Sequence, residues 1–229
     1  MNGNDAAHAA TGVGQLNALI GGLEDKLAAW AEATSSWLGT TGKVTGTGID
    51  KFIRPAVAGF MSEENSLLAG AGFVAAAGLL GEERSYIAWW QGADMERVDA
   101  LANFSPQSTS RYVKAEWFKV PMATGQPHVT GPYIDLLCTD EYVLTFTHPI
   151  FRDGEPAGVV GLDVTAQAME RAALGILRQI GPHAVLVNAG GRSVVSASAE
   201  VDAGDVATLA QGAADYPVGR QFSICSATA

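Results

Sequence analysis

Two aspartates in strand-like segments could together hold a positively charged group. The segment "VTGPYID" at 129–135 places Tyr133 and Asp135 two residues apart, and "GVVGLDV" at 158–164 carries Asp163 two residues after Gly161. Residues i and i+2 of a strand share a face, so each pair points to one side of a sheet. In the second segment, the alternate residues on the other face are apolar, which predicts that this face packs in the core: Val160, Leu162 and Val164. A carboxylate on a mostly apolar strand needs a partner, because burying an unpaired charge is very costly.

Aromatic residues crowd the same part of the chain, at Tyr86, Trp89, Trp90, Tyr112, Trp117, Phe118 and Tyr133. Carboxylates beside ring faces can hold an organic cation, and each cation–π contact contributes about 0.5–2 kcal/mol. A simpler explanation competes with this one. Aromatic residues at strand and helix spacing usually form core, and Asp163, close before a helix, can serve as a cap or a dipole partner. Composition and spacing alone slightly favour the simpler explanation.

Composition and motifs disfavour several other functions. The 229-residue chain has a formal net charge of -10, which disfavours binding to nucleic acid or to anionic lipid. The four histidines lack the spacing of a zinc site, and the two cysteines, Cys138 and Cys225, form no metal-spaced pair. No nucleophile elbow, phosphate-binding loop or complete dinucleotide fingerprint is present. We therefore expect no metal and no cofactor, and an enzyme is the less favoured class.

The hydrophobic pattern predicts an α+β fold. Apolar residues recur at helical spacing over 16–38, and a second helix is expected over 49–60, with Pro55 inside it. Strand-like runs follow from residue 71, interrupted by a helix near 112–118 that Pro121 should close; Asp153-Gly154 marks a hairpin. Thr165 should cap a helix that runs to Gly181. Beyond it we expect two strands within 183–198, a weak helix near 205–213 and a terminal strand near 220–227.

These elements divide the chain into three segments. Residues 1–60 form an N-terminal helical segment, residues 61–181 carry the antiparallel sheet with flanking helices, and residues 182–229 form a small second αβ unit or the incomplete start of one.

The order of several segments resembles a Cache domain, the PDC sensor module of bacterial signalling proteins. The resemblance runs from about Leu67 to Ser198 and rests on "GAGFVAAAGLL", "SYIAWWQG", "EWFKVPMATGQPHVTGPYID", "YVLTFTHPIFRDGEPAGVVGLDV" and "LVNAGGRSVVSAS". The family implies a PAS-like sheet whose pocket binds a small metabolite, and a long N-terminal helix that passes on a conformational signal. In members that bind amino acids, aspartates at the positions of Asp135 and Asp163 hold the ligand ammonium, with Tyr133 beside them.

One position departs from that pattern. The family's arginine for the ligand carboxylate falls at Ala115, which supplies no cationic donor; Arg111 or Lys114 are the nearby substitutes. We therefore hypothesise that the ligand is a small cationic amine, quaternary amine or polyamine. Trp89, Trp90 and Trp117 join Tyr133 as aromatic walls, and the remaining expected site residues are Tyr86, Arg111 and Tyr112. The alternatives are a sensor of amino acids or small carboxylates, an enzyme that uses the aspartates as acid and base, and an interaction module.

The family also bears on location and assembly. Most Cache domains face outward between membrane helices, whereas this sequence shows neither a signal peptide nor a membrane span. The sequence therefore predicts a cytoplasmic sensor, or an extracytoplasmic one if the chain is a fragment of a longer receptor. Residues 15–38 could pair two copies or a partner signalling protein, or could simply cover the back of the sheet.

Overall fold

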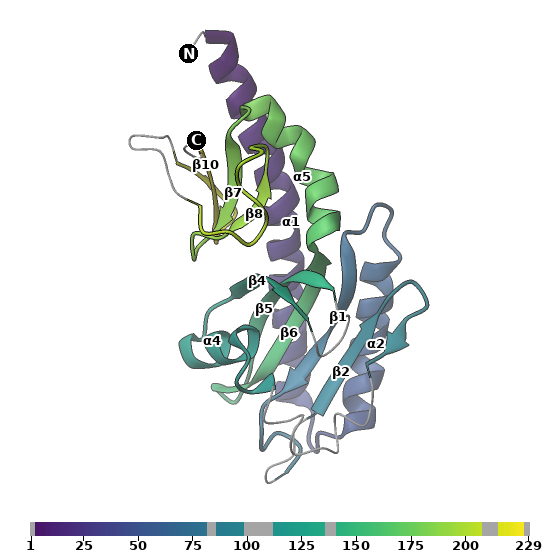
Figure 1. The fold of residues 1–229 in the computed structure, drawn as a ribbon. Helices are drawn as coiled ribbons and strands as arrows, with labels where there is room; N and C mark the ends of the chain where they lie inside the picture. Colours follow the sequence, from purple (N-terminus) through teal and green to yellow (C-terminus); the bar gives the residue numbers. More distant parts are fainter. Residues whose placement is uncertain (1–2, 82–85, 99–111, 136–140, 208–214, 227–229) are drawn as a thin grey trace.

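The fold is α+β, as the sequence predicts, with a long helix packed against two antiparallel sheets (Figure 1). The computed structural model describes residues 3–81, 86–98, 112–135, 141–207 and 215–226. Its main sheet has six strands in the order β3-β2-β1-β6-β5-β4. Their bounds are β1 Leu68–Ala75, β2 Tyr86–Gln91, β3 Glu96–Arg97, β4 His128–Ile134, β5 Tyr142–Arg152 and β6 Glu155–Thr165.

The central hairpin joins β5 and β6, the two longest strands of the main sheet. Asp153 and Gly154 form its turn with φ values of 53° and 85°. Positive φ at both central residues is what a tight two-residue hairpin requires, and Asp-Gly accommodates it at little cost. The hairpin predicted from the sequence is confirmed, and together with a register shift between Ile150 and Phe151 it places Thr145 opposite Asp163.

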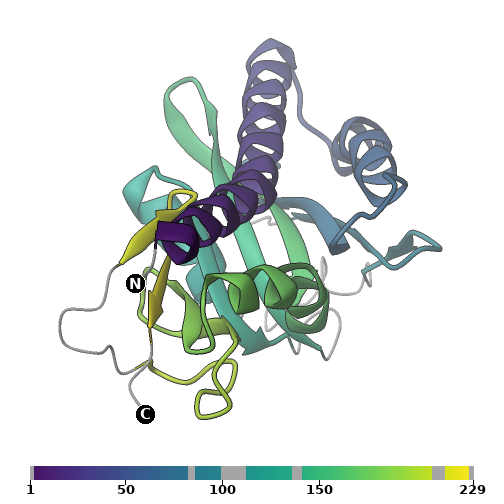
Figure 2. The ribbon, with the colours of Figure 1, turned by 90° about the horizontal axis from the view of Figure 1, so that it is seen from above.

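Two helices cover one face of the main sheet. Helix α1 (Gly3–Thr40) packs on β5 and β6, and α2 (Gly46–Met61) packs on β1 and β2. The Trp37 ring stacks on Phe52 with centroids 4.5 Å apart, and Trp30 meets Phe60 edge-on at 5.2 Å, which ties the two helices together. Figure 2 shows α1 continuing past the main sheet to the second one.

The apolar side of α1 is buried within the chain's own core. Its buried residues on this side are Leu16, Ile20, Leu23, Leu27, Trp30, Ala31 and Leu38. Of the two roles expected for residues 15–38, the structure therefore supports covering the sheet.

The second sheet is small and follows helix α5 (Ala166–Ile180). Its strands are β7 Ala184–Asn188, β8 Ser193–Ser196, β9 Tyr216–Val218 and β10 Phe222–Ser226, in the order β8-β7-β10-β9. Thr165 caps α5, with its Oγ1 accepting the Ala168 N–H at 3.0 Å. The helix expected near 205–213 is wrong for its described residues, 205–207, since Val206 instead bridges to Arg192. The remainder of that segment, 208–213, lies outside the described residues.

Helix α4 (Glu116–Thr124) differs from its expected limits. Pro121 does not close it but lies inside it: the helix continues to Thr124 despite the lost N–H bond and the clash with the preceding turn that a proline brings. The helix ends at Gly125, which adopts the left-handed conformation (φ 68°) and donates its N–H to the Pro121 carbonyl at 2.9 Å.

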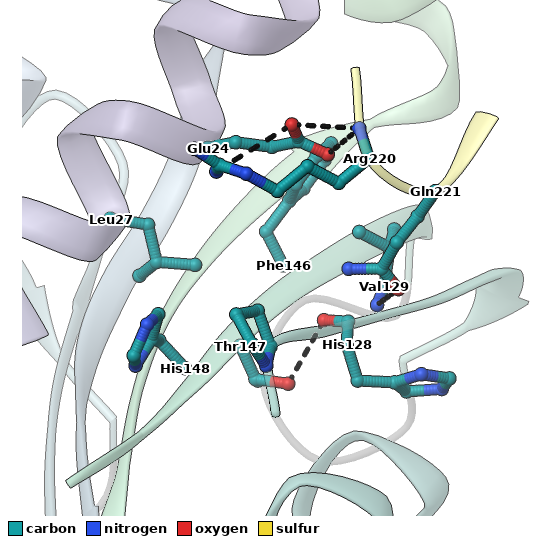
Figure 3. Close-up of a pocket in the computed structure, with 10 residues that line it drawn as sticks. Glu24, Leu27, His128, Val129, Phe146, Thr147, His148, Arg220 and Gln221 are labelled. Atoms are coloured by element: carbon teal, nitrogen blue, oxygen red, sulfur yellow. Dashed lines mark hydrogen bonds and ion pairs between the residues drawn. The ribbon is translucent and has the colours of Figure 1, made fainter. Parts of the chain in front are cut away.

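The turn between β9 and β10 attaches the second sheet to α1 (Figure 3). Asn17 Oδ1 accepts the Gly219 N–H at 2.9 Å, and the buried Glu24 carboxylate accepts the Arg220 N–H at 3.0 Å. The next residue, Gln221, reaches the main sheet, where its Oε1 accepts the Val129 N–H at 2.8 Å. The void between these elements is about 10 Å³, which is room for about one water molecule. This region is therefore a structural junction.

We predict that Glu24→Ala lowers the free energy of unfolding by about 1–3 kcal/mol, because it leaves the Arg220 N–H without its charged acceptor. Asp25→Ala is the matched control, since Asp25 pairs with the same arginine but its side chain is 72% exposed, so its loss should cost less than about 0.5 kcal/mol. Urea unfolding at pH 7 measures both. Equal losses in the two variants would contradict the assignment.

Candidate functional site

A row of polar side chains crosses the face of the main sheet opposite α1 and α2. Asp163 on β6 is paired in register with Thr145 on β5 and Gly70 on β1. Thr145 Oγ1 donates to Asp163 Oδ1 at 2.7 Å, and the Tyr133 hydroxyl lies 2.8 Å from the same Thr145 oxygen. The structure thus links two of the predicted site residues, Tyr133 and Asp163, through Thr145. Thr145 was missed because cross-strand register is not visible in one sequence.

Asp135 lies at the same end of the sheet, directly after β4. It is 4% exposed, and its N–H donates to the Glu141 carbonyl at 2.9 Å. The register of β4 against β5 shifts between Thr130 and Tyr133, so Thr130 and Tyr133 both lie on the sheet face that carries Thr145. The negative charge of Asp135 reaches Asp163, where it contributes to a raised pKa.

Burial dominates the electrostatics of Asp163. The pKa of its carboxyl group is raised from 3.8 to about 8, and loss of hydration is the largest cause; the hydrogen bond from Thr145 acts to lower it, and the negative charge of Asp135 acts to raise it. Within the described residues, no lysine or arginine forms an ion pair with Asp163. At neutral pH the group is therefore mostly protonated until a cation comes close enough to stabilise its charge.

The indole of Trp89 lies flat over three strand glycines. A Cβ atom added at Gly161 would lie 2.9 Å from the Trp89 ring, one at Gly72 2.7 Å from it, and one at Gly70 2.9 Å from its Nε1. The absence of a side chain beside Asp163 therefore makes room for a ring, and this ring forms the floor of the site.

Further aromatic residues pack on the same face. Tyr112, Trp117 and Phe118 are buried together, with ring centroids 5.5–6.4 Å apart, and they join Trp89 in one cluster. Ala115 precedes α4 and packs against the cluster, partly buried. Five of the expected site residues are thus gathered near Asp163 or in this cluster: Tyr133, Asp135, Trp89, Tyr112 and Trp117.

Two expected site residues, the wall residue Trp90 and Tyr86, lie on the other face of the sheet. Trp90 is in the main core, with the Arg97 guanidinium 5.7 Å from its ring centroid. The Tyr86 hydroxyl donates to Asp50 on α2 at 3.0 Å. The reason is strand parity, since residues 86, 88 and 90 of β2 face α2 while residue 89 faces Asp163. Trp90 and Tyr86 therefore lie on the face that α2 covers, not on the face of Asp163 where they were expected. Arg111 lies outside the described residues.

An open groove of about 300 Å³ adjoins the end of the polar row. It is lined by Ala69, Gln91, Gly92, Ala93, Asp94, Glu96 and Glu141. Gln91 lies opposite Gly70 in register, and the carbonyl of Glu141 holds the backbone of Asp135. The groove therefore adjoins the row at Gln91, and its three acidic residues favour the approach of cations.

Other kinds of site find no support in the described part of the chain. Its His, Cys, Asp and Glu side chains form no group of three or more that could hold a metal ion. None of the helices within the described ranges combines the length and the apolar character needed to cross a membrane.

Comparison with known proteins relates the chain to bacterial sensors. Residues 68–171 match the family model of the first PDC sensor domain of methyl-accepting chemotaxis protein-like proteins. No curated protein sequence matches the chain.

Solved structures share the fold at low sequence identity. The ligand-binding domain of the Pseudomonas aeruginosa amino acid chemoreceptor PctC, in complex with GABA, is 14% identical, with a TM-score of 0.57 over 97% of this chain and 96% of that one. The sensory domain of the Campylobacter jejuni chemoreceptor Tlp3 with isoleucine bound is 13% identical, with a TM-score of 0.60 over 99% and 91%. The domain of Pseudomonas fluorescens CtaA with L-alanine is 15% identical, with a TM-score of 0.56 over 94% and 84%.

The raised pKa of Asp163 predicts a pH-dependent stability. In the ligand-free protein the folded state keeps the Asp163 proton up to about pH 8, whereas the unfolded state loses it near 3.8. The wild type should therefore lose stability relative to Asp163→Asn as pH rises through this window, by up to about 1.4 kcal/mol per pH unit between pH 5 and 7. Urea unfolding of both proteins from pH 4 to 9 measures the difference. A difference that is independent of pH would show that Asp163 ionises normally.

Proposed function

Because residues 68–171 form a PDC sensor domain, we propose that the chain senses a small metabolite with a primary ammonium group, and that this metabolite is an amino acid. The observation that carries the proposal is the pair of buried carboxylates on one sheet face. Asp135 and Asp163 lie close enough for the charge of one to shift the other, next to a floor of aromatic rings. An ammonium group offers three N–H donors and a positive charge to such a site.

The energetics of Asp163 suit reversible binding of a cation. A buried carboxylate without a cationic partner avoids the cost of its charge by keeping its proton. An ammonium group that enters the site supplies the missing positive charge, so Asp163 releases its proton and forms a charge-assisted hydrogen bond. Ligand binding and proton release are therefore coupled at this residue.

The relatives support an amino acid over the simple amine expected from the sequence. Three fold neighbours are complexes with GABA, isoleucine or L-alanine, each of which carries both an ammonium and a carboxylate group. An amine without a carboxylate remains the second candidate, favoured by Ala115, which brings no charge to the aromatic cluster. The relationship to chemoreceptor domains also supports sensing over catalysis.

We further propose that the chain is the sensor part of a longer receptor and meets its ligand outside the cytoplasm. This is the second of the two locations considered from the sequence, and the match to chemotaxis receptor-like sensors supports it over the cytoplasmic one. Helix α1, which packs on both sheets, is the element suited to pass a ligand-induced change onward.

A binding screen tests the ligand class. We expect one or more of the twenty amino acids or GABA to raise the melting temperature of the purified chain, and titration calorimetry to give a saturable isotherm. Asp163→Asn and Asp135→Asn should each weaken binding at least about tenfold, because each removes a charged acceptor for the ammonium. Asp25→Asn, a change at an exposed carboxylate, should leave affinity unchanged. Undiminished binding by both site variants would place the ligand elsewhere.

Proton release gives a second signature. At pH 7 we expect binding of an ammonium ligand to release up to one proton from Asp163, and affinity to rise from pH 6 to 8, where the ammonium itself stays charged. Calorimetry in buffers of different ionisation enthalpy counts the protons released. Asp163→Asn should abolish the release, and an unchanged count in that variant would assign the proton to another group.

A further inference from the structure

Three of the buried polar atoms that lack a partner among the described residues lie on the sheet face that carries Asp163. Among the described residues, Trp89 Nε1, Gln91 Oε1 and Thr130 Oγ1 are buried and make no hydrogen bond. Gln91 lies opposite Gly70 on β1, and Thr130 lies opposite Thr145 on β5, so both belong to the same cross-strand row as Asp163. Buried polar groups in folded proteins are nearly always bonded, so a row of open donors and acceptors marks a place for a polar ligand.

Trp89 is the most informative of the three residues. A threonine hydroxyl can rotate, and a glutamine amide can exchange its donor and acceptor ends, but an indole N–H can only donate. Trp89 is 4% exposed, so water does not readily satisfy this donor. Its Nε1 lies directly over Gly70, 2.9 Å from where a Cβ atom of that residue would be. Gly70 is the register partner of Asp163 on the neighbouring strand.

We propose that the Trp89 indole N–H binds the carboxylate of the ligand whose ammonium group Asp163 holds. The inference rests on the proposed function and assigns a binding partner to the other end of the same ligand. Neighbouring strands are about 4.8 Å apart, so a donor over β1 and an acceptor on β6 are separated by roughly the distance that a short amino acid spans. A neutral donor then binds the ligand carboxylate, so the site needs no arginine at position 115, where this chain has alanine.

The three glycines under the ring are consistent with this role. A glycine inside a strand weakens it, because it costs conformational entropy and adds no packing. Any side chain at Gly70 or Gly161 would push on the indole. The glycines therefore hold the N–H at a fixed height over the sheet, beside Asp163, and a preorganised donor loses little entropy when it binds.

Matched ligand pairs test the inference. Each pair compares an amino acid with the amine that lacks its carboxylate: L-alanine with ethylamine, L-valine with isobutylamine and GABA with propylamine. We expect the wild type to bind the amino acid of at least one pair more tightly than its amine. Trp89→Phe keeps a ring but removes the N–H, so calorimetry should show amino acid affinity falling about tenfold or more, with amine affinity within about twofold of wild type.

Trp30→Phe is the matched control. Trp30 also has a buried Nε1 without a partner among the described residues, but it packs in the core between α1 and α2, and its loss should change neither affinity. Should Trp89→Phe fail to fold, Gly70→Ala replaces it. The added Cβ displaces Nε1, and the same selective loss of amino acid binding is expected.

The outcomes separate the two proposals. Equal losses for both members of a pair would make Trp89 a wall only and overturn the inference, as would an unchanged amino acid affinity in Trp89→Phe. A wild type that binds the amines at least as tightly as the amino acids would overturn the carboxylate role while leaving the ammonium site intact. Binding of both ligand types by Asp163→Asn at wild-type affinity would overturn the proposed function itself.

Discussion

The burial of Asp163 on one face of the main sheet is the constraint on which the site depends. A carboxyl group at this depth either keeps its proton or needs a cation, and within the described residues only Thr145 is seen to bond it. The hydrogen bonds from Tyr133 through Thr145 fix its orientation. An acidic groove is lined in part by Gln91, which belongs to the same cross-strand row. The neutral, desolvated acid can therefore respond to the arrival of an ammonium group.

The apolar core on the other face of the sheet stabilises the fold and so offsets the cost of burying Asp163. Helices α1 and α2 cover that face with a continuous apolar core, which helps to hold β1, β5 and β6 in register. Parity along each strand then divides the side chains cleanly. Leu162 and Val164 stabilise the fold, while Asp163 between them is left available for a ligand.

Strand β4 connects the site to the second sheet. Its C-terminal end carries Tyr133 and leads to Asp135, and its N-terminal part is bonded to the second sheet at two points: Gln221 accepts the Val129 N–H, and Asn188 donates to the Gly131 carbonyl. The same second sheet is attached to α1 through Glu24. A ligand that shifts Tyr133 or Asp135 would thus move β4. Because β4 is bonded to the second sheet, and the second sheet is bonded to α1, the shift could pass to α1.

The sequence by itself determined most of the elements and the two faces of β6, with Leu162 and Val164 in the core and Asp163 opposite. Periodicity located α1, α2, α5 and the long strands, Asp153-Gly154 the hairpin and Thr165 the helix cap, because each depends on residues near one another in the chain. The tertiary structure alone decided which faces meet. Trp89 and Trp90 are adjacent, yet the first lies over the glycines beside Asp163 and the second lies in the main core. Thr145, Gly70 and the open indole N–H depend on register between strands, which long-range packing sets and local sequence does not encode.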